Sequence, residues 1–130
     1  MAVGAEGAAA LAPALAANGS LTVTNLLGNR LDAESAKMLA EVAKQKGISL
    51  CGIQRDQTTA DFSNQNLKPP DAILLASDLS QAGVPGLLTS LDLSNNELCG
   101  GTSWGATYTA EGITAIADAL RVTGSLTEVR

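Results

Sequence analysis

The 130-residue sequence has no histidine, only three aromatic residues and only two cysteines. Without histidine, it lacks the side chain that most often transfers protons near neutral pH or binds transition metals. Cys51 and Cys99 lack metal-ligand spacing, and two isolated cysteines favour a reduced, cytoplasmic chain over a disulfide-stabilised one. The sequence also lacks carboxylates paired at a defined spacing and a glycine-rich phosphate loop. We therefore expect no enzyme activity, no cofactor and no bound metal.

Basic residues and long apolar runs are also scarce. The sequence has eight basic and thirteen acidic residues, and the net charge of -5 argues against a nucleic-acid partner. No stretch reaches membrane-spanning length, so we expect no membrane partner. The alanine-rich N-terminal segment is not preceded by Lys or Arg. Because residues 5–22 match residues 110–127 at eleven of eighteen positions, the segment is interpreted as a repeated helix, not as a secretion signal.

The hydrophobic residues, 45% of the sequence, follow a repeating pattern. Residues 88–98 read L-x-x-L-x-L-x-x-N-x-L, weaker copies occupy 21–31 and 57–67, and a fourth copy begins at Leu126. The copies lie further apart than the usual 20–29 residues, which predicts insertions at 54–60 and 99–108. Amphipathic helices are predicted between the copies from four apolar stripes with helical spacing. These stripes are Ala8, Leu11, Ala12 and Leu15; Ala36, Leu39, Ala40 and Ala43; Ala72, Leu75, Ala76 and Leu79; and Ile113, Ile116, Ala117 and Leu120.

The 88–98 motif, followed by a helix of the type A-E-G-I-x-A-I-A-D-A-L and a G-S-L-T link, resembles the ribonuclease-inhibitor-like subfamily of leucine-rich-repeat proteins. The resemblance implies an α/β fold, a short curved solenoid or horseshoe arc with parallel strands on its concave face and helices on its convex face. We therefore expect residues 1–130 to form a single leucine-rich-repeat domain of about four repeats, without evident capping units. Proteins of this family generally bind other proteins, but the resemblance identifies no partner.

The polar positions of the repeats fall into two groups. Where the chain leaves each strand, a side-chain amide can bond backbone groups that the turn leaves unpaired, which predicts a structural role. These positions are Asn29, Gln65 and Asn96. The outward strand positions either form a partner-binding concave face, on which Asn25, Asp61 and Asp92 line up, or simply keep the sheet soluble. The candidate binding residues are Asn25, Asp61, Ser63, Asp92, Ser94 and Glu128.

The insertion at 99–108 contains the only Trp and the only Tyr of the sequence, Trp104 and Tyr108. Amphipathic aromatic rings are common at interfaces, so this loop is a second candidate for partner binding. Alternatively, Trp104 covers an edge of the repeat array.

Two functions from different classes agree with these observations. In the first, the chain is a non-catalytic protein-protein interaction module or scaffold, part of a larger leucine-rich-repeat protein, and its partner is a protein. In the alternative, it is a structural unit that associates with itself end to end through Leu126 and Val129, and its sheet face binds no other ligand.

Overall fold

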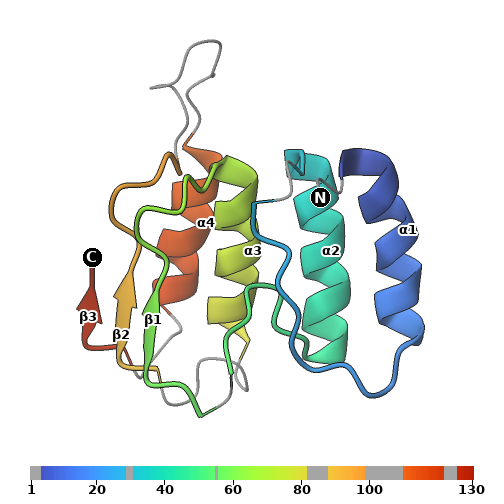
Figure 1. Cartoon of the computed structure of the whole chain (residues 1–130), viewed down its shortest axis with the longest axis horizontal. Helices are drawn as coiled ribbons and strands as arrows, with labels where there is room; N and C mark the ends of the chain where they lie inside the picture. The colour runs from blue at the N-terminus through green and yellow to red at the C-terminus, as the bar shows by residue number, and fades with distance from the viewer. Residues whose placement is uncertain (1–3, 29–30, 55, 82–87, 99–109, 122–125) are drawn as a thin grey trace.

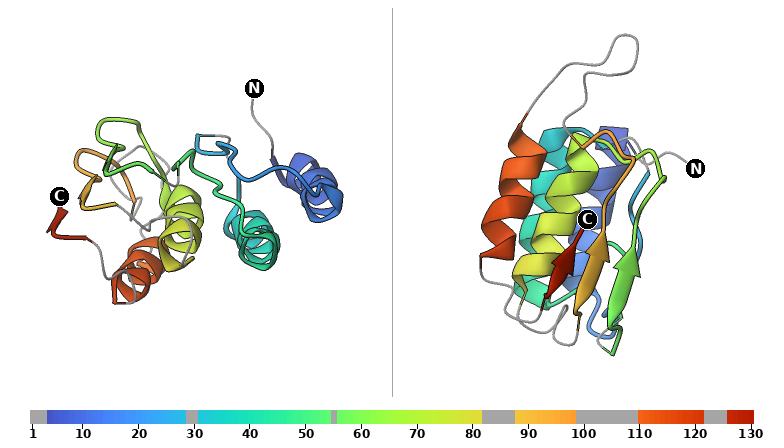
Figure 2. Two further views of the ribbon diagram at one scale, coloured as in Figure 1. Left: turned by 90° about the horizontal axis from the view of Figure 1, so that it is seen from below. Right: turned by 90° about the vertical axis from the view of Figure 1, so that its left-hand side faces the viewer.

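The computed structural model describes residues 4–28, 31–54, 56–81, 88–98, 110–121 and 126–130. It contains four described helices. These lie in a row, and a small sheet packs on one side of that row, so the structure has two layers (Figures 1 and 2). The elements follow one another along the chain as α1 (Gly4–Ala17), α2 (Ala33–Lys46), β1 (Thr59–Asp61), α3 (Pro69–Ser80), β2 (Ser90–Asp92), α4 (Glu111–Leu120) and β3 (Glu128–Val129).

The sheet is parallel, with strand order β1-β2-β3. Thr59, Ala60 and Asp61 of β1 face Ser90, Leu91 and Asp92 of β2, and Ser90 faces Glu128 of β3. Neighbouring parallel strands need a long crossover connection between them. Here α3 connects β1 to β2, and α4 connects β2 to β3. Each helix also contacts the next helix along the chain, so the four lie side by side in sequence order (Figure 2).

The expected horseshoe solenoid is wrong. The structure is a small α/β unit in which helices dominate and the sheet has three short strands. Within its described residues, 21–28 and 31, the first repeat copy forms no continuous strand. It forms only isolated bridges, from Val23 to Ser49 and from Asn25 to Cys51, and so it pairs with residues 49–51, not with the second copy at 57–67.

The physical reason lies in residues 48–53, which precede the insertion expected at 54–60. Ile48, Leu50 and Ile53 are almost completely buried, so this segment occupies a row of its own in the core. Its backbone bonds the first copy directly: Thr24 N donates to Ser49 O at 2.8 Å, and Leu26 N donates to Leu50 O at 2.8 Å. The regular alignment of the first and second copies, which the solenoid requires, is therefore not formed.

The leucines of the repeat copies contribute to one hydrophobic core between the two layers. At the sixth position of the motif, Leu26 and Phe62 are buried while Leu93 is half-buried against the same core. At the eleventh position, Leu31, Leu67 and Leu98 are all buried. The apolar stripes predicted for α2 and α3 are buried as well.

Helix α4 buries only part of its predicted stripe. Ile116 is buried and Leu120 half-buried, but Ile113 and Ala117 are exposed, and Gly112 and Ala119 outside the stripe are buried. The difference has a physical reason, because α4 packs along α3 and reaches α2 through the Lys37–Glu111 ion pair, whereas α2 and α3 each pack along two helices.

Local sequence signals explain where α2 and α3 begin and end. Asp32 caps α2, since its Oδ1 accepts a hydrogen bond from Ser35 N at 2.7 Å, and Gly47 ends the helix in the left-handed conformation with φ 70°. Helix α3 starts with two prolines, whose missing N–H groups cost nothing in the first turn. Asp71 Oδ2 accepts a hydrogen bond from Lys68 N at 2.9 Å, and this bond fixes the entry to α3.

A buried carboxyl group connects α3 to residues 48–53, which we call the inserted row because they lie between the first and second repeat copies. Asp78 has no exposed surface, and it accepts hydrogen bonds from Ser49 Oγ at 2.7 Å, Leu50 N at 2.8 Å and Cys51 N at 3.1 Å. Burial raises the pKa of Asp78, although the hydrogen bonds from Ser49, Leu50 and Cys51 partly oppose the shift. The carboxyl group thus satisfies backbone N–H groups that no strand partner satisfies.

Candidate functional site

Two turns of the same construction follow β1 and β2. Asp61 Oδ1 accepts hydrogen bonds from Ser63 N at 2.9 Å and Ser63 Oγ at 2.6 Å, and Asp92 Oδ1 accepts the same pair from Ser94 at 2.9 and 2.6 Å. Asp, Asn and Ser favour such turns because their short side chains bond the backbone two residues away. Since Asp61 and Asp92 are paired in register, their carboxylates are held side by side at the same end of the sheet.

The residue after each serine strengthens the equivalence of the two turns. Asn64 and Asn95 both adopt left-handed backbone conformations, with φ 58° and 60°. Asparagine tolerates this region better than most residues. The turns are therefore determined by local sequence, and they present their polar groups without help from a ligand.

Electrostatics keep the second carboxylate charged. The hydrogen bonds from the side chain and backbone of Ser94 lower the pKa of Asp92, and the nearby charge of Arg130 lowers it further. Arg130 also forms an ion pair with Glu128 at 2.7 Å, at the exposed edge of the sheet. Asp61 and Asp92 thus lie at the strand ends with Arg130 near Asp92, while Glu128 faces Ser90 at the start of β2.

Asn25 forms a similar turn in a different place. Its Oδ1 accepts a hydrogen bond from Leu27 N at 3.0 Å, as the aspartates do at the ends of β1 and β2. However, Asn25 is bridged to Cys51, so the expected alignment of Asn25 with Asp61 and Asp92 across one sheet is wrong. The reason is again the inserted row at 48–53.

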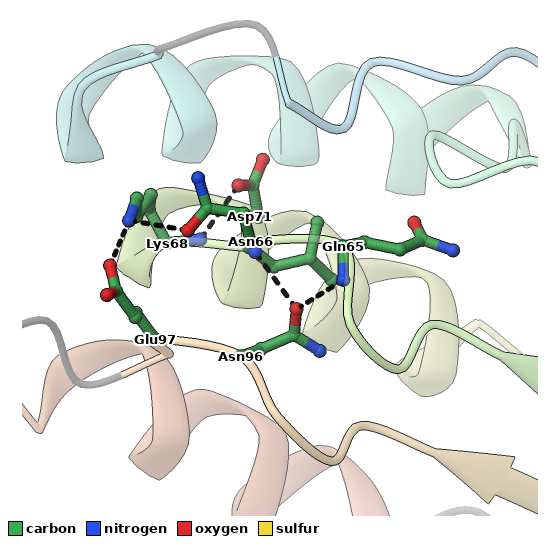
Figure 3. Close-up of polar contacts among 7 residues, drawn as sticks. Gln65, Asn66, Lys68, Asp71, Asn96 and Glu97 are labelled. Carbon is green, nitrogen blue, oxygen red and sulfur yellow. Dashed lines mark hydrogen bonds and ion pairs between the residues drawn. The ribbon is translucent and has the colours of Figure 1, made fainter.

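Asn96 connects the two turns through five backbone groups. Its Nδ2 donates to Phe62 O at 2.7 Å, Leu93 O at 3.1 Å and Ser94 O at 3.4 Å. Its Oδ1 accepts from Gln65 N at 3.1 Å and Leu67 N at 3.0 Å. Figure 3 shows this amide directed at the neighbouring 65–67 segment. A single side chain therefore holds the two turns in register.

The other two predicted structural positions differ from Asn96. The side chain of Gln65 is exposed, and its Nε2 donates only a long hydrogen bond to Asp61 O, at 3.4 Å. The longer side chain therefore does not repeat the bridging geometry of Asn96. Asn29 lies outside the described residues, as do Trp104 and Tyr108, the two aromatic residues proposed for partner binding.

The sequence analysis missed a polar cluster beside these turns. Lys68 Nζ donates to Asn66 Oδ1 at 2.9 Å and forms an ion pair with Glu97 (Figure 3). Asp71 Oδ1 accepts a hydrogen bond from Gly28 N at 3.1 Å. Residues around it line a cavity of about 580 Å³. The proline pair after Lys68 was a usable signal for the start of α3, but the pairing of Lys68 with Glu97 depends on tertiary structure.

The described residues provide little for catalysis or metal binding. Burial, with a further contribution from the Asp78 charge, raises the pKa of the Cys51 thiol well above its ordinary value of 9.0, so this thiol is a poor nucleophile. No three Cys, Asp or Glu side chains within the described ranges are grouped so that they could hold a metal ion. Among the helices of the described chain, none is both long and apolar enough to cross a bilayer.

No protein-family model matches the sequence, and no curated protein matches it.

Proposed function

We propose that this chain is a non-catalytic protein-interaction module or scaffold whose contact surface lies at the ends of β1 and β2. We call this the acidic strand-end surface, and it consists of Asp61, Ser63, Asp92 and Ser94. Glu128 faces Ser90 at the start of β2 and lies outside this surface. Its partner is a protein segment that carries Lys or Arg. Asn25 lies outside this surface because it belongs to the row paired with residues 49–51.

The observation that carries the proposal is the fixed orientation of the two carboxylates. In each aspartate, Oδ1 bonds both groups of the serine two residues later, which leaves Oδ2 without a recorded hydrogen bond from the described part of the chain. A ligand therefore meets carboxylates whose side-chain entropy is already lost, and this reduces the cost of binding.

The chemistry of the surface indicates how the partner binds. It has no described Trp, Tyr or Phe that could act as an interface anchor, and the one phenylalanine of the chain, Phe62, is buried beneath it. Binding should therefore depend mainly on charge-assisted hydrogen bonds from Arg or Lys, and it should weaken as salt is added.

The test compares capture of partner proteins from the native source by matched variants. The Asp61→Asn, Asp92→Asn double variant removes two charges, but the Oδ1 bond in each turn should remain, because Asn25 already makes that bond to Leu27 N. The control variant, Glu41→Gln with Asp118→Asn, removes two exposed charges from the helical layer.

We expect the strand-end variant to lose partners that the wild type and the control variant retain. A Lys substitution at Asp61 and Asp92 should abolish capture of the same partners. Equal capture by the strand-end and control variants would show that the acidic strand-end surface is not the binding site.

A further inference from the structure

The helices bury equivalent positions against their neighbours, with one exception. Ala12 of α1, Ala40 of α2 and Ala76 of α3 occupy the same place in the repeated helix pattern, and they are 6%, 7% and 8% exposed. Ala117 of α4 is the fourth member of this set, and it is exposed. One face that is covered in three helices is therefore open in α4.

The neighbouring position on this face behaves in the same way. Ala36 of α2 and Ala72 of α3 are completely buried, whereas their equivalent in α4, Ile113, is 38% exposed. The exposed residue is also the largest apolar side chain of the three. An exposed isoleucine beside an exposed alanine is typical of a helix face that packs against something else.

Contacts between α3 and α4 show what covers such a face inside the chain. A Cβ atom built at Gly112 would lie 2.7 Å from Ala72 Cβ and 2.7 Å from Pro69 O, so α4 accepts α3 at close range through a glycine. Ile116 and Ala119 complete this receiving face of α4, and both are buried. The face of α3 that contains Ala72 is thus covered by the next helix in the chain, α4, which has a glycine, Gly112, in its first turn.

The sequence contains a second helix of the receiving type. Residues 5–22 match residues 110–127 at eleven of eighteen positions, and the match places Gly7, Leu11 and Ala14 of α1 at the positions of Gly112, Ile116 and Ala119. In α1, Gly7 and Leu11 are only half-buried and Ala14 is exposed. The exposed positions recorded for α1 are all small and apolar, namely Ala10, Pro13, Ala14, Ala16 and Ala17.

We infer that α4 of one copy of this chain packs on α1 of a second copy, in the way that α3 packs on α4 within one copy. The occupant is a second copy because one chain carries both halves of the contact, and the receiving half repeats the sequence of α4 itself. The inference goes beyond the proposed function, because it concerns the helical layer, not the acidic strand-end surface.

The strands agree with this arrangement. Helix α3 leads to β2 and α4 leads to β3, and these helices and strands are neighbours in both layers. Helix α1 leads to residues 22–26. Packing α4 on α1 of a second copy therefore places β3, where Val129 is exposed, beside residues 22–26 of that copy. Such a head-to-tail contact leaves one free face at each end, so it can continue to a third copy.

The experiment measures mass by sedimentation velocity over a range of protein concentrations. The wild type should change from a 13.1 kDa monomer to larger species as the concentration rises. Ile113→Lys blocks the α4 face and Ala14→Lys blocks the α1 face, so each variant alone should stay monomeric. Met38→Lys is the matched control, because Met38 on α2 is also 38% exposed but belongs to neither face. This variant should behave like the wild type.

A mixture of the two blocked variants distinguishes head-to-tail packing from other contacts. Ile113→Lys retains an intact α1 face and Ala14→Lys retains an intact α4 face, so an equal mixture should form a dimer and nothing larger. Ala117→Lys serves in place of Ile113→Lys if circular dichroism shows that the latter does not fold. A wild type that stays monomeric at its highest soluble concentration, or a mixture that forms no dimer, would overturn the inference.

Discussion

Replacement of Asp78 should reveal the cost of leaving the inserted row without its hydrogen-bond partner. In Asp78→Ala, Leu50 N and Cys51 N lose their acceptor inside the core, while the Ser49 hydroxyl can rotate to another acceptor. A buried donor without a partner costs about 1–3 kcal/mol. The two backbone donors together should therefore lower the free energy of unfolding by about 2–6 kcal/mol, relative to the wild type.

Asp78→Asn separates the hydrogen bonds from the volume of the side chain. The amide oxygen can still accept from Leu50 N, but an NH2 group replaces Oδ2 and faces Cys51 N, so one donor loses its partner. We expect a loss of about 1–3 kcal/mol, smaller than the loss in the alanine variant. Urea unfolding gives all three free energies. If alanine and asparagine cost the same, or if neither reduces stability, the hydrogen-bond explanation of this row is incorrect.

The same carboxyl group should produce a measurable pH dependence. Because burial raises the pKa of Asp78 above its ordinary value of 3.8, the folded chain holds this proton at pH values where the unfolded chain has lost it. The contribution of protonated Asp78 to the free energy of unfolding is fully present below about pH 3.8. It is lost as the pH rises through the raised pKa of the folded chain. The lowered pKa of Asp92 acts in the opposite sense, as its contribution is lost when the pH falls. Urea unfolding of the wild type and Asp78→Asn at several pH values isolates the Asp78 contribution, and parallel curves would contradict it.

Three further substitutions, two of them paired with a control substitution, test the packing and the turns by urea unfolding. Leu39→Ala should lower stability by about 2–5 kcal/mol because it opens a cavity under α2, whereas Met38→Ala, at a partly exposed position, should cost clearly less. Equal effects would contradict the assigned core. Gly112→Ala should lower the free energy of unfolding by about 1–3 kcal/mol, because the new methyl group meets the first turn of α3. Alanine favours helices more than glycine does, so a gain in stability would refute this close approach. Asn96→Ala should cost about 1–3 kcal/mol and Gln65→Ala almost nothing, and comparable losses would show that Asn96 does not connect the turns.

The sequence predicts the helices of this chain better than its sheet. Apolar residues at helical spacing identify α2 with its correct buried face, because that periodicity is a local property. They also identify α3, but this helix is buried on every side from Asp71 to Leu79, which the predicted stripe does not indicate. Pairing between segments is not local. Residues 48–53 have the composition of a strand start, but only the fold shows that they lie between the first and second copies, which excludes the regular solenoid. The exposed face of α4 was missed for the same reason, since exposure depends on which helices are neighbours.

The candidate site divides in a similar way. The D-x-S turns after β1 and β2 follow from adjacent residues, and their register follows from the repeated motif. Asp78 gave no signal in the sequence, because an aspartate in a helix is usually a surface residue. Its role arises only because α3 passes beneath the backbone of residues 49–51, and no local pattern records that contact.

The most direct test of the central claim is an amide hydrogen-exchange footprint of the chain with and without a captured partner. The account predicts slower exchange on binding at the turns of the acidic strand-end surface, between residues 61 and 66 and between residues 92 and 97, with no change in the exposed face of α2. Protection confined to the helices, with unchanged exchange in both turns, would contradict the proposal that these turns form the binding surface.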